Sequence, residues 1–173
     1  MNRGKIWFVL FKTAIFTAAV PFTIGWWLPT RIHRAFDVSS NVPSGAFALQ
    51  VSSYFLLLLG AAVYLWCAWD FSVKGLGTPA PIDAPKNLVV NGLYRYVRNP
   101  MYLGVFGIVA SRALYFWSLP VFSYFVVAAT CAILFVHFYE EPHLRKIFGE
   151  QYVDYLRRVP GWLPRFSAIR SDR

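Results

Sequence analysis

The sequence predicts an all-α integral membrane protein with about four transmembrane helices and a C-terminal amphipathic helix lying at the interface. Of its 173 residues, 57% are hydrophobic and only 14% are charged. Soluble domains, by contrast, are about 45–50% apolar and about 25% charged. Apolar runs of about 20 residues, the length that crosses a bilayer, recur along the chain. This composition excludes a soluble globular domain and a disordered chain.

The first 70 residues are expected to contain two spans. The first apolar run, 7–28, follows Arg3 and is too long for the core of a cleaved signal peptide, so it predicts an uncleaved anchor helix. Residues 29–45 are rich in Pro, Ser and Asn and predict a loop. The second span is expected over 46–69. Together with residues 71–165, the two spans are expected to form a single membrane domain over 1–173.

Residues 71–165 are expected to form a connector, a helical hairpin and a surface helix. The connector, 71–99, is polar at first and then rich in Leu, Val, Tyr and Arg. Two apolar runs, 101–117 and 120–139, are joined so closely that they must form an antiparallel hairpin. We expect Asn99 to cap its first helix. Apolar residues at helical spacing predict one amphipathic helix over 142–158.

The distribution of basic residues predicts the orientation. Most Lys and Arg lie in the N-terminal segment, the connector and the tail, whereas Arg31, Arg34 and Arg112 lie on the other side of the predicted spans. The positive-inside rule therefore places both termini and the connector in the cytoplasm. We expect a multi-pass protein of a bacterial inner membrane. Membrane orientation and contact with anionic lipid therefore explain the net charge of +9. For this reason no nucleic-acid partner is expected.

The hairpin brings two groups of reactive residues to the same membrane surface. Arg98, Asn99 and Tyr102 lie at the start of its first helix, and Glu140, Glu141 and His143 lie at the end of its second. A carboxylate such as Glu140 can accept hydrogen bonds from an ammonium group, an arginine can hold a carboxylate, and tyrosine faces favour a cation. Together these groups suit S-adenosylmethionine. The spacing alone leaves open that these residues only anchor helices at the interface. The His and Cys residues have no metal-site spacing, so no metal is expected.

Two motifs resemble a known family of membrane enzymes. The stretch NLVVNGLYRYVRNPMYLG, from Asn87 to Gly104, resembles the signature of isoprenylcysteine carboxyl methyltransferases and the related phospholipid N-methyltransferases. The stretch EEPHLRKIFGEQYVDYLRRVPGWLP, from Glu140 to Pro164, resembles the ending of the same family. The motifs occur in the family's order, separated by a helical hairpin, and the resemblance covers about residues 75–165.

The resemblance implies a membrane methyltransferase that uses S-adenosylmethionine in a cytoplasmic pocket, with a lipophilic or small acceptor. Arg98 and Glu141 belong to the motifs and are expected to lie close to the cofactor as support. The cofactor contacts carried over by position are Lys86, Asn87, Leu88, Val89, Tyr94, Asn99, Pro100, Met101, Tyr102 and Glu140.

Two departures from the family bear on the acceptor. Asn99 replaces the family's histidine and cannot carry a proton, so no general base is expected there. Val136 stands where the carboxyl methyltransferases have an arginine, which argues against a carboxylate acceptor and leaves carboxyl, amine and thiol acceptors open. The catalytic residues stay unassigned, with His137 and Tyr102 as candidate bases. The alternative functions are an NADPH-dependent membrane reductase related to sterol reductases and a non-catalytic membrane binding module.

Overall fold

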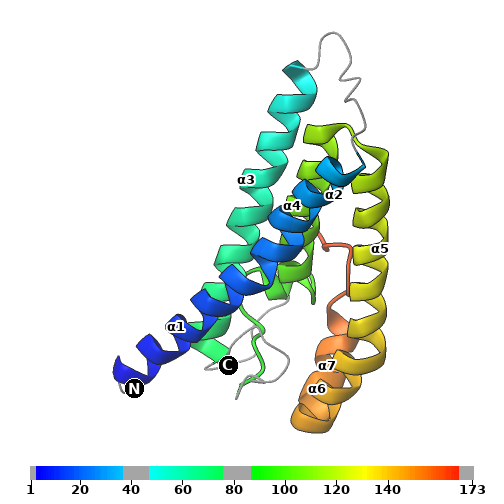
Figure 1. Cartoon of the computed structure of the whole chain (residues 1–173). Helices are drawn as coiled ribbons and strands as arrows, with labels where there is room; N and C mark the ends of the chain where they lie inside the picture. Colours follow the sequence, from blue (N-terminus) through cyan, green and yellow to red (C-terminus); the bar gives the residue numbers. More distant parts are fainter. Residues whose placement is uncertain (1–2, 37–46, 76–86, 168–173) are drawn as a thin grey trace.

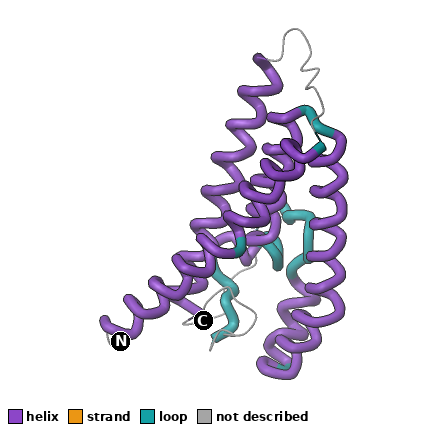
Figure 2. Tube along the Cα trace, viewed as in Figure 1, coloured by secondary structure: helices purple, strands orange, loops and turns teal. Residues whose placement is uncertain are grey.

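A computed structural model describes residues 3–36, 47–75 and 87–167 of the chain (Figure 1). All regular elements in these three ranges are helical (Figure 2), which confirms the all-α prediction for the described residues. In chain order the elements are α1 (Arg3–Ala19), η1 (Thr23–Trp27), α2 (Leu28–Ala35), α3 (Phe47–Asp70), η2 (Phe71–Gly75), η3 (Gly92–Arg95), α4 (Pro100–Phe116), α5 (Leu119–Phe135), η4 (Val136–Glu140), α6 (Glu141–Phe148) and α7 (Glu150–Arg158).

The first helical segment extends further than the sequence pattern indicated. The expected loop over 29–45 is wrong for residues 29–35, which belong to α2. Pro29 lies in the first turn of α2, directly after the π-helical turn η1. The backbone N–H of Phe36 donates to the carbonyl of Ile32 and closes the last turn. Residues 37–46 lie outside the described part of the chain.

Helices α3 and α4 pack against each other through glycines. A Cβ built on Gly104 would lie only 2.8 Å from the carbonyl oxygen of Gly60 and 2.8 Å from the backbone nitrogen of Tyr64. Such close approach of two backbones is typical of small residues at helix contacts in membranes. The pair forms the centre of the bundle, with α1 crossing it and α5 beside α4 (Figure 1).

The predicted hairpin is confirmed as α4 and α5. Trp117 adopts a left-handed conformation with φ 45°, which ends α4, and Pro120 lies in the first turn of α5. Asn99 occupies the N-cap position of α4, but its side chain makes no capping hydrogen bond. The predicted cap is therefore wrong, because the Asn99 amide donates instead to the carbonyl of Gly161.

Two helical segments within the described residues are long and apolar enough to cross a membrane. They cover Phe47–Val73 and Leu119–Phe148, and α4 is a shorter apolar helix. The second span expected from the sequence therefore coincides with α3. The total of about four spans remains a prediction.

The predicted amphipathic helix over 142–158 is two helices. Gly149 has φ 55° and ψ −132°, a backbone conformation essentially confined to glycine, and it separates α6 from α7. Helix α6 continues the line of α5 through η4, and α7 turns back beside α6 (Figure 1). The residues after α7 therefore run back towards the start of α4.

Candidate functional site

The end of the connector, residues 87–91, is held between two helices. Its side chains alternate, as in any extended segment. Val89 is buried against Cys67 of α3 and against Tyr94. Leu88 and Val90 pack against a cluster on α7 formed by Tyr152, Tyr155 and Val159. The connector and the C-terminal helix are thus joined by apolar contacts.

Backbone groups of the connector also bind the segment that follows α7. The N–H of Arg98 donates to the carbonyl of Pro160 at 2.9 Å, and the N–H of Arg165 donates to the carbonyl of Tyr96 at 3.0 Å. The hydroxyl of Tyr155 donates to the carbonyl of Tyr94 at 2.7 Å. These bonds fix residues 94–98 of the first motif against the end of the second motif.

Two side-chain pairs join the start of α4 to the junction of η4 and α6. Arg98 Nη1 donates to Glu141 Oε1 at 2.6 Å, and Tyr102 Oη donates to Glu140 Oε2 at 2.7 Å. The Arg98 and Glu141 side chains are only 17% and 14% exposed. The predicted meeting of Arg98, Tyr102, Glu140 and Glu141 is therefore present in the fold, with both carboxylates held by donors from the first motif.

One buried donor of the Arg98 guanidinium, its Nε, has no hydrogen-bond partner among the residues that the structure describes. Tyr152 lies close enough for Arg98 and Glu141 to influence its hydroxyl. Burial, together with the nearby charges of Glu141 and Glu140 and against the opposing effect of Arg98, raises the pKa of Tyr152 to about 12. Burial likewise raises the pKa of Tyr155 and of Tyr94 above the ordinary tyrosine value. The tyrosines around Arg98 are thus held neutral over the physiological range.

An aromatic side chain that the sequence reasoning missed lies against this site. Trp162 follows α7, and its ring lies 6.1 Å from the ring of Tyr102 and stacks on Phe106 at 5.8 Å. Pro160, Gly161 and Pro164 indicate that the amphipathic helix ends there, but nothing in the segment VPGWLP indicates which rings Trp162 contacts. Asn99, whose amide binds the neighbouring Gly161, is buried.

The remaining predicted residues divide into those near the two pairs and those away from them. Pro100 is buried and Met101 half-buried at the start of α4, whereas Asn87 is exposed. His137 is exposed and its ring packs on Phe138. Within the described residues it makes no hydrogen bond to Tyr102 or Glu140, and its role as a base stays a prediction. Lys86 lies outside the described residues.

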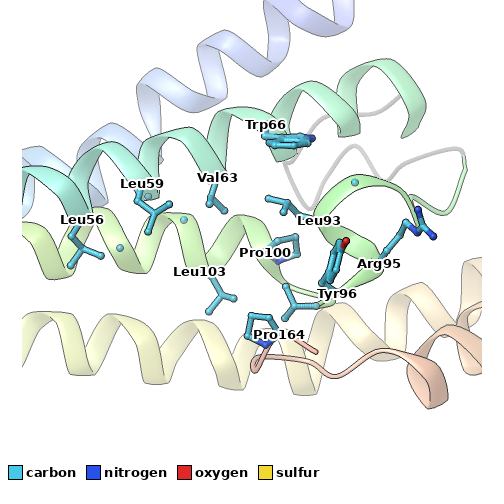
Figure 3. Close-up of a pocket in the computed structure, with 15 residues that line it drawn as sticks. Leu56, Leu59, Val63, Trp66, Leu93, Arg95, Tyr96, Pro100, Leu103 and Pro164 are labelled. Atoms are coloured by element: carbon cyan, nitrogen blue, oxygen red, sulfur yellow. The ribbon is translucent and has the colours of Figure 1, made fainter. Parts of the chain in front are cut away.

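An apolar groove of about 680 Å³ lies between α3 and α4 (Figure 3). Leu56, Leu59 and Val63 of α3 line one side, and Leu103 of α4 lines the other. One end is closed by Trp66 of α3 together with Arg95 and Tyr96, which lie at the end of η3. On α4, the residues facing the groove are on the opposite side from Tyr102 and Phe106. The groove and the Glu140 site therefore share the start of α4 but open on different faces.

The match to a family model agrees with this arrangement. The model for phospholipid methyltransferases matches residues 49–151, which include α3, both members of each side-chain pair and the hairpin. The chain belongs to the phospholipid methyltransferase family. This confirms the resemblance seen in the two motifs.

Individual relatives are methyltransferases of two kinds. The chain is 32% identical over 123 residues to a phosphatidylethanolamine N-methyltransferase of Pyrenophora tritici-repentis, which covers 68% of this chain and 12% of that protein. It is 39% identical over 85 residues to methanethiol S-methyltransferase 2 of Bradyrhizobium diazoefficiens, which covers 46% of this chain and 30% of that protein. The chain thus spans less than a third of the length of either relative. No solved structure matches it at a significant level.

Proposed function

We propose that this chain is an S-adenosylmethionine-dependent methyltransferase of the membrane, acting on the amine of a phospholipid headgroup. The observation that carries the proposal is the joining of the two family motifs by the pairs Arg98–Glu141 and Tyr102–Glu140. The family match supports the reaction class, and the two long apolar helices support a membrane location.

The side chains present fit the chemical groups of the cofactor. Glu140 offers a carboxylate to an ammonium group, and the buried Nε of Arg98 is a donor that no described residue accepts. The rings of Tyr102 and Trp162 offer faces that favour a sulfonium cation. The residues that would hold the cofactor are therefore Glu140, Arg98, Tyr102 and Trp162, with the backbone of 87–90 beside them.

The protein's part in the reaction is orientation and exclusion of water. The cofactor supplies an activated methyl group together with its leaving group, so the enzyme gains most by fixing the reacting atoms in line. Arg98 and Glu141 neutralise each other and hold the start of α4 against α6. Tyr102 donates a hydrogen bond to Glu140 and thereby fixes the direction of that carboxylate.

The phospholipid acceptor is favoured by the apolar groove. Its lining of Leu56, Leu59, Val63 and Leu103 suits an acyl chain. The groove opens on the other face of α4 from Glu140, but it includes Pro100, two residues before Tyr102, so a headgroup would reach the site around the start of α4. A small thiol is the second candidate, because the relative with the higher identity is a methanethiol S-methyltransferase. In both cases the site, both termini and the connector would face the cytoplasm of a bacterial cell.

Ligand binding tests the cofactor assignment. We expect the purified protein to bind S-adenosylhomocysteine in calorimetry and not to bind NADPH. Glu140→Gln should weaken this binding at least tenfold, whereas the exposed Glu150→Gln should leave it unchanged. Binding of NADPH alone would favour the reductase alternative, and equal affinities of wild type and Glu140→Gln would disprove the role of Glu140.

Methyl transfer tests the acceptor. The protein should transfer labelled methyl groups to vesicles of phosphatidylethanolamine and not to phosphatidylcholine, which has no free amine. Transfer to methanethiol instead would establish the thiol candidate. Adenosyl-ligand binding without transfer to lipid, thiol or a native membrane extract would identify a binding module.

A further inference from the structure

Among the described residues, the charged side chains at the end of the bundle opposite Glu140 are all basic. There the end of α2, the end of α4 and the start of α5 lie together (Figure 1). Arg31 and Arg34 are exposed on α2, and Arg112 lies in the last turns of α4. The acidic residues that the structure describes all belong to the other end: Asp70, Glu140, Glu141, Glu150 and Asp154.

Arg112 is buried at this end within a cage of aromatic rings. Its side chain is 8% exposed, and its guanidinium carbon lies 4.1 Å from the ring of Trp26, 4.5 Å from Phe116 and 5.0 Å from Tyr115. One nitrogen donates a long hydrogen bond of 3.4 Å to Thr30 Oγ1. Contacts with rings compensate a buried cation only in part, because its N–H donors still need acceptors.

Three buried polar atoms lie on the elements that meet at this end of the bundle. Arg112 Nε, His33 Nδ1 and Ser118 Oγ have no hydrogen-bond partner among the described residues. The ring of His33 stacks on Phe116 at 4.1 Å, with 12° between the planes. Ser118 is 4% exposed and follows Phe116 by two residues, at the junction with α5. All three groups can donate to an oxyanion, and buried polar atoms rarely stay unpaired.

We propose that Arg112, His33 and Ser118 bind the phosphate group of a membrane phospholipid. A phosphate has enough acceptor oxygens for all three donors. Its negative charge would also balance the positive charge of the Arg112 guanidinium. Arg112 lies four residues, or about 6 Å, before the end of α4, so it is close to the membrane surface at which α4 and α5 turn. This site is separate from the Glu140 site. The proposal requires that the chain is inserted in a membrane, and it does not require that the chain transfers methyl groups.

Native mass spectrometry of the detergent-purified protein tests this site. We expect retention of phosphatidylglycerol and no retention of diacylglycerol with the same acyl chains. Arg112→Gln should lower the affinity for phosphatidylglycerol at least tenfold, whereas Arg31→Gln, exposed at the same end, should not. Equal binding of diacylglycerol, or equal losses in both variants, overturns the proposal. Binding of inorganic phosphate without lipid binding overturns the assignment to a lipid.

Milder substitutions cover the case in which Arg112→Gln does not fold. His33→Phe retains a ring to stack on Phe116, and Ser118→Ala removes only a hydroxyl. Each should weaken phosphatidylglycerol binding about threefold or more without lowering the melting temperature, and unchanged binding in both overturns the proposal. Asp37, outside the described residues, is the acid nearest in sequence to α2. The Asp37→Asn variant should retain wild-type stability and lipid affinity. If the effects of Asp37→Asn and Arg112→Gln on stability were strongly coupled in a double-mutant cycle, Asp37 and not the lipid would be the counter-ion of Arg112, and the proposal would be overturned.

Discussion

Arg98 and Glu141 are separated by 43 residues of sequence, yet their side chains form an ion pair of 2.6 Å between the connector and α6. Neither side chain is more than 17% exposed. A pair in this setting is screened little by water, so removing one partner leaves a largely buried charge unbalanced.

Glu141→Gln is therefore expected to lower the free energy of unfolding by about 2 kcal/mol, since hydrogen bonds to charged groups contribute about 1.5–3 kcal/mol. Denaturation in mixed micelles measures this loss. The double variant with Arg98→Met should lose less than the sum of the two single variants. Strict additivity would show that the pair contributes nothing, and the exposed Glu150→Gln serves as the control.

Tyr102→Phe should weaken the binding of S-adenosylhomocysteine about three- to tenfold. The substitution keeps the ring beside Trp162 and removes the hydroxyl that holds Glu140 at 2.7 Å. A lost hydrogen bond of this kind is worth about 1 kcal/mol. Calorimetry with Tyr139→Phe as the matched control measures the change. Affinity equal to that of wild type would mean that Tyr102 does not position Glu140.

Gly104→Ala should destabilise the fold by about 1–3 kcal/mol, the usual cost of overpacking. The added methyl group would meet backbone atoms of Gly60 and Tyr64, which cannot move aside as a flexible side chain could. Thermal unfolding followed by circular dichroism measures the loss. Leu58→Ala, on the same helix as Gly60 and 70% exposed, should change the melting temperature far less. A stable Gly104→Ala variant would contradict the close contact of α3 and α4.

Alkaline pH should weaken the fold through the buried tyrosine Tyr152. Its folded pKa is raised from 10.0 to about 12, so the folded state holds this proton more tightly than the unfolded state. The resulting stability is complete below pH 10 and is lost as the pH rises towards 12. Unfolding measured across this window should be flatter with pH for Tyr152→Phe than for wild type. An identical slope would show that Tyr152 does not titrate with folding.

The apolar pattern was sufficient to predict α3 and the α4–α5 hairpin, because long unbroken apolar runs admit few alternatives. It failed at residues 29–35, where Pro, Thr and Arg predict a loop but Pro29 fits the first turn of a helix. It also failed at Gly149, since a single left-handed residue leaves the apolar spacing on either side intact.

Part of the candidate site could also be predicted. The pairing of the two motifs follows from the hairpin, which returns Glu140 and Glu141 to the level of Arg98 and Tyr102. The contacts of Trp162 and Gly161 could not be predicted, because they depend on how far α7 turns back. That angle is a property of tertiary packing and has no local signature in the sequence.

The continuity of α5, η4 and α6 makes the distance along this helix a determinant of the site. Glu140 and Glu141 stand at its far end from the hairpin turn, and each inserted residue rotates everything beyond it by about 100°. One residue added in the middle of α5 would turn both carboxylates away from Tyr102 and Arg98 while leaving the composition of the membrane segment unchanged. The number of residues in this helix is therefore as important for the pairing of Glu140 and Glu141 with Tyr102 and Arg98 as the acidic residues themselves.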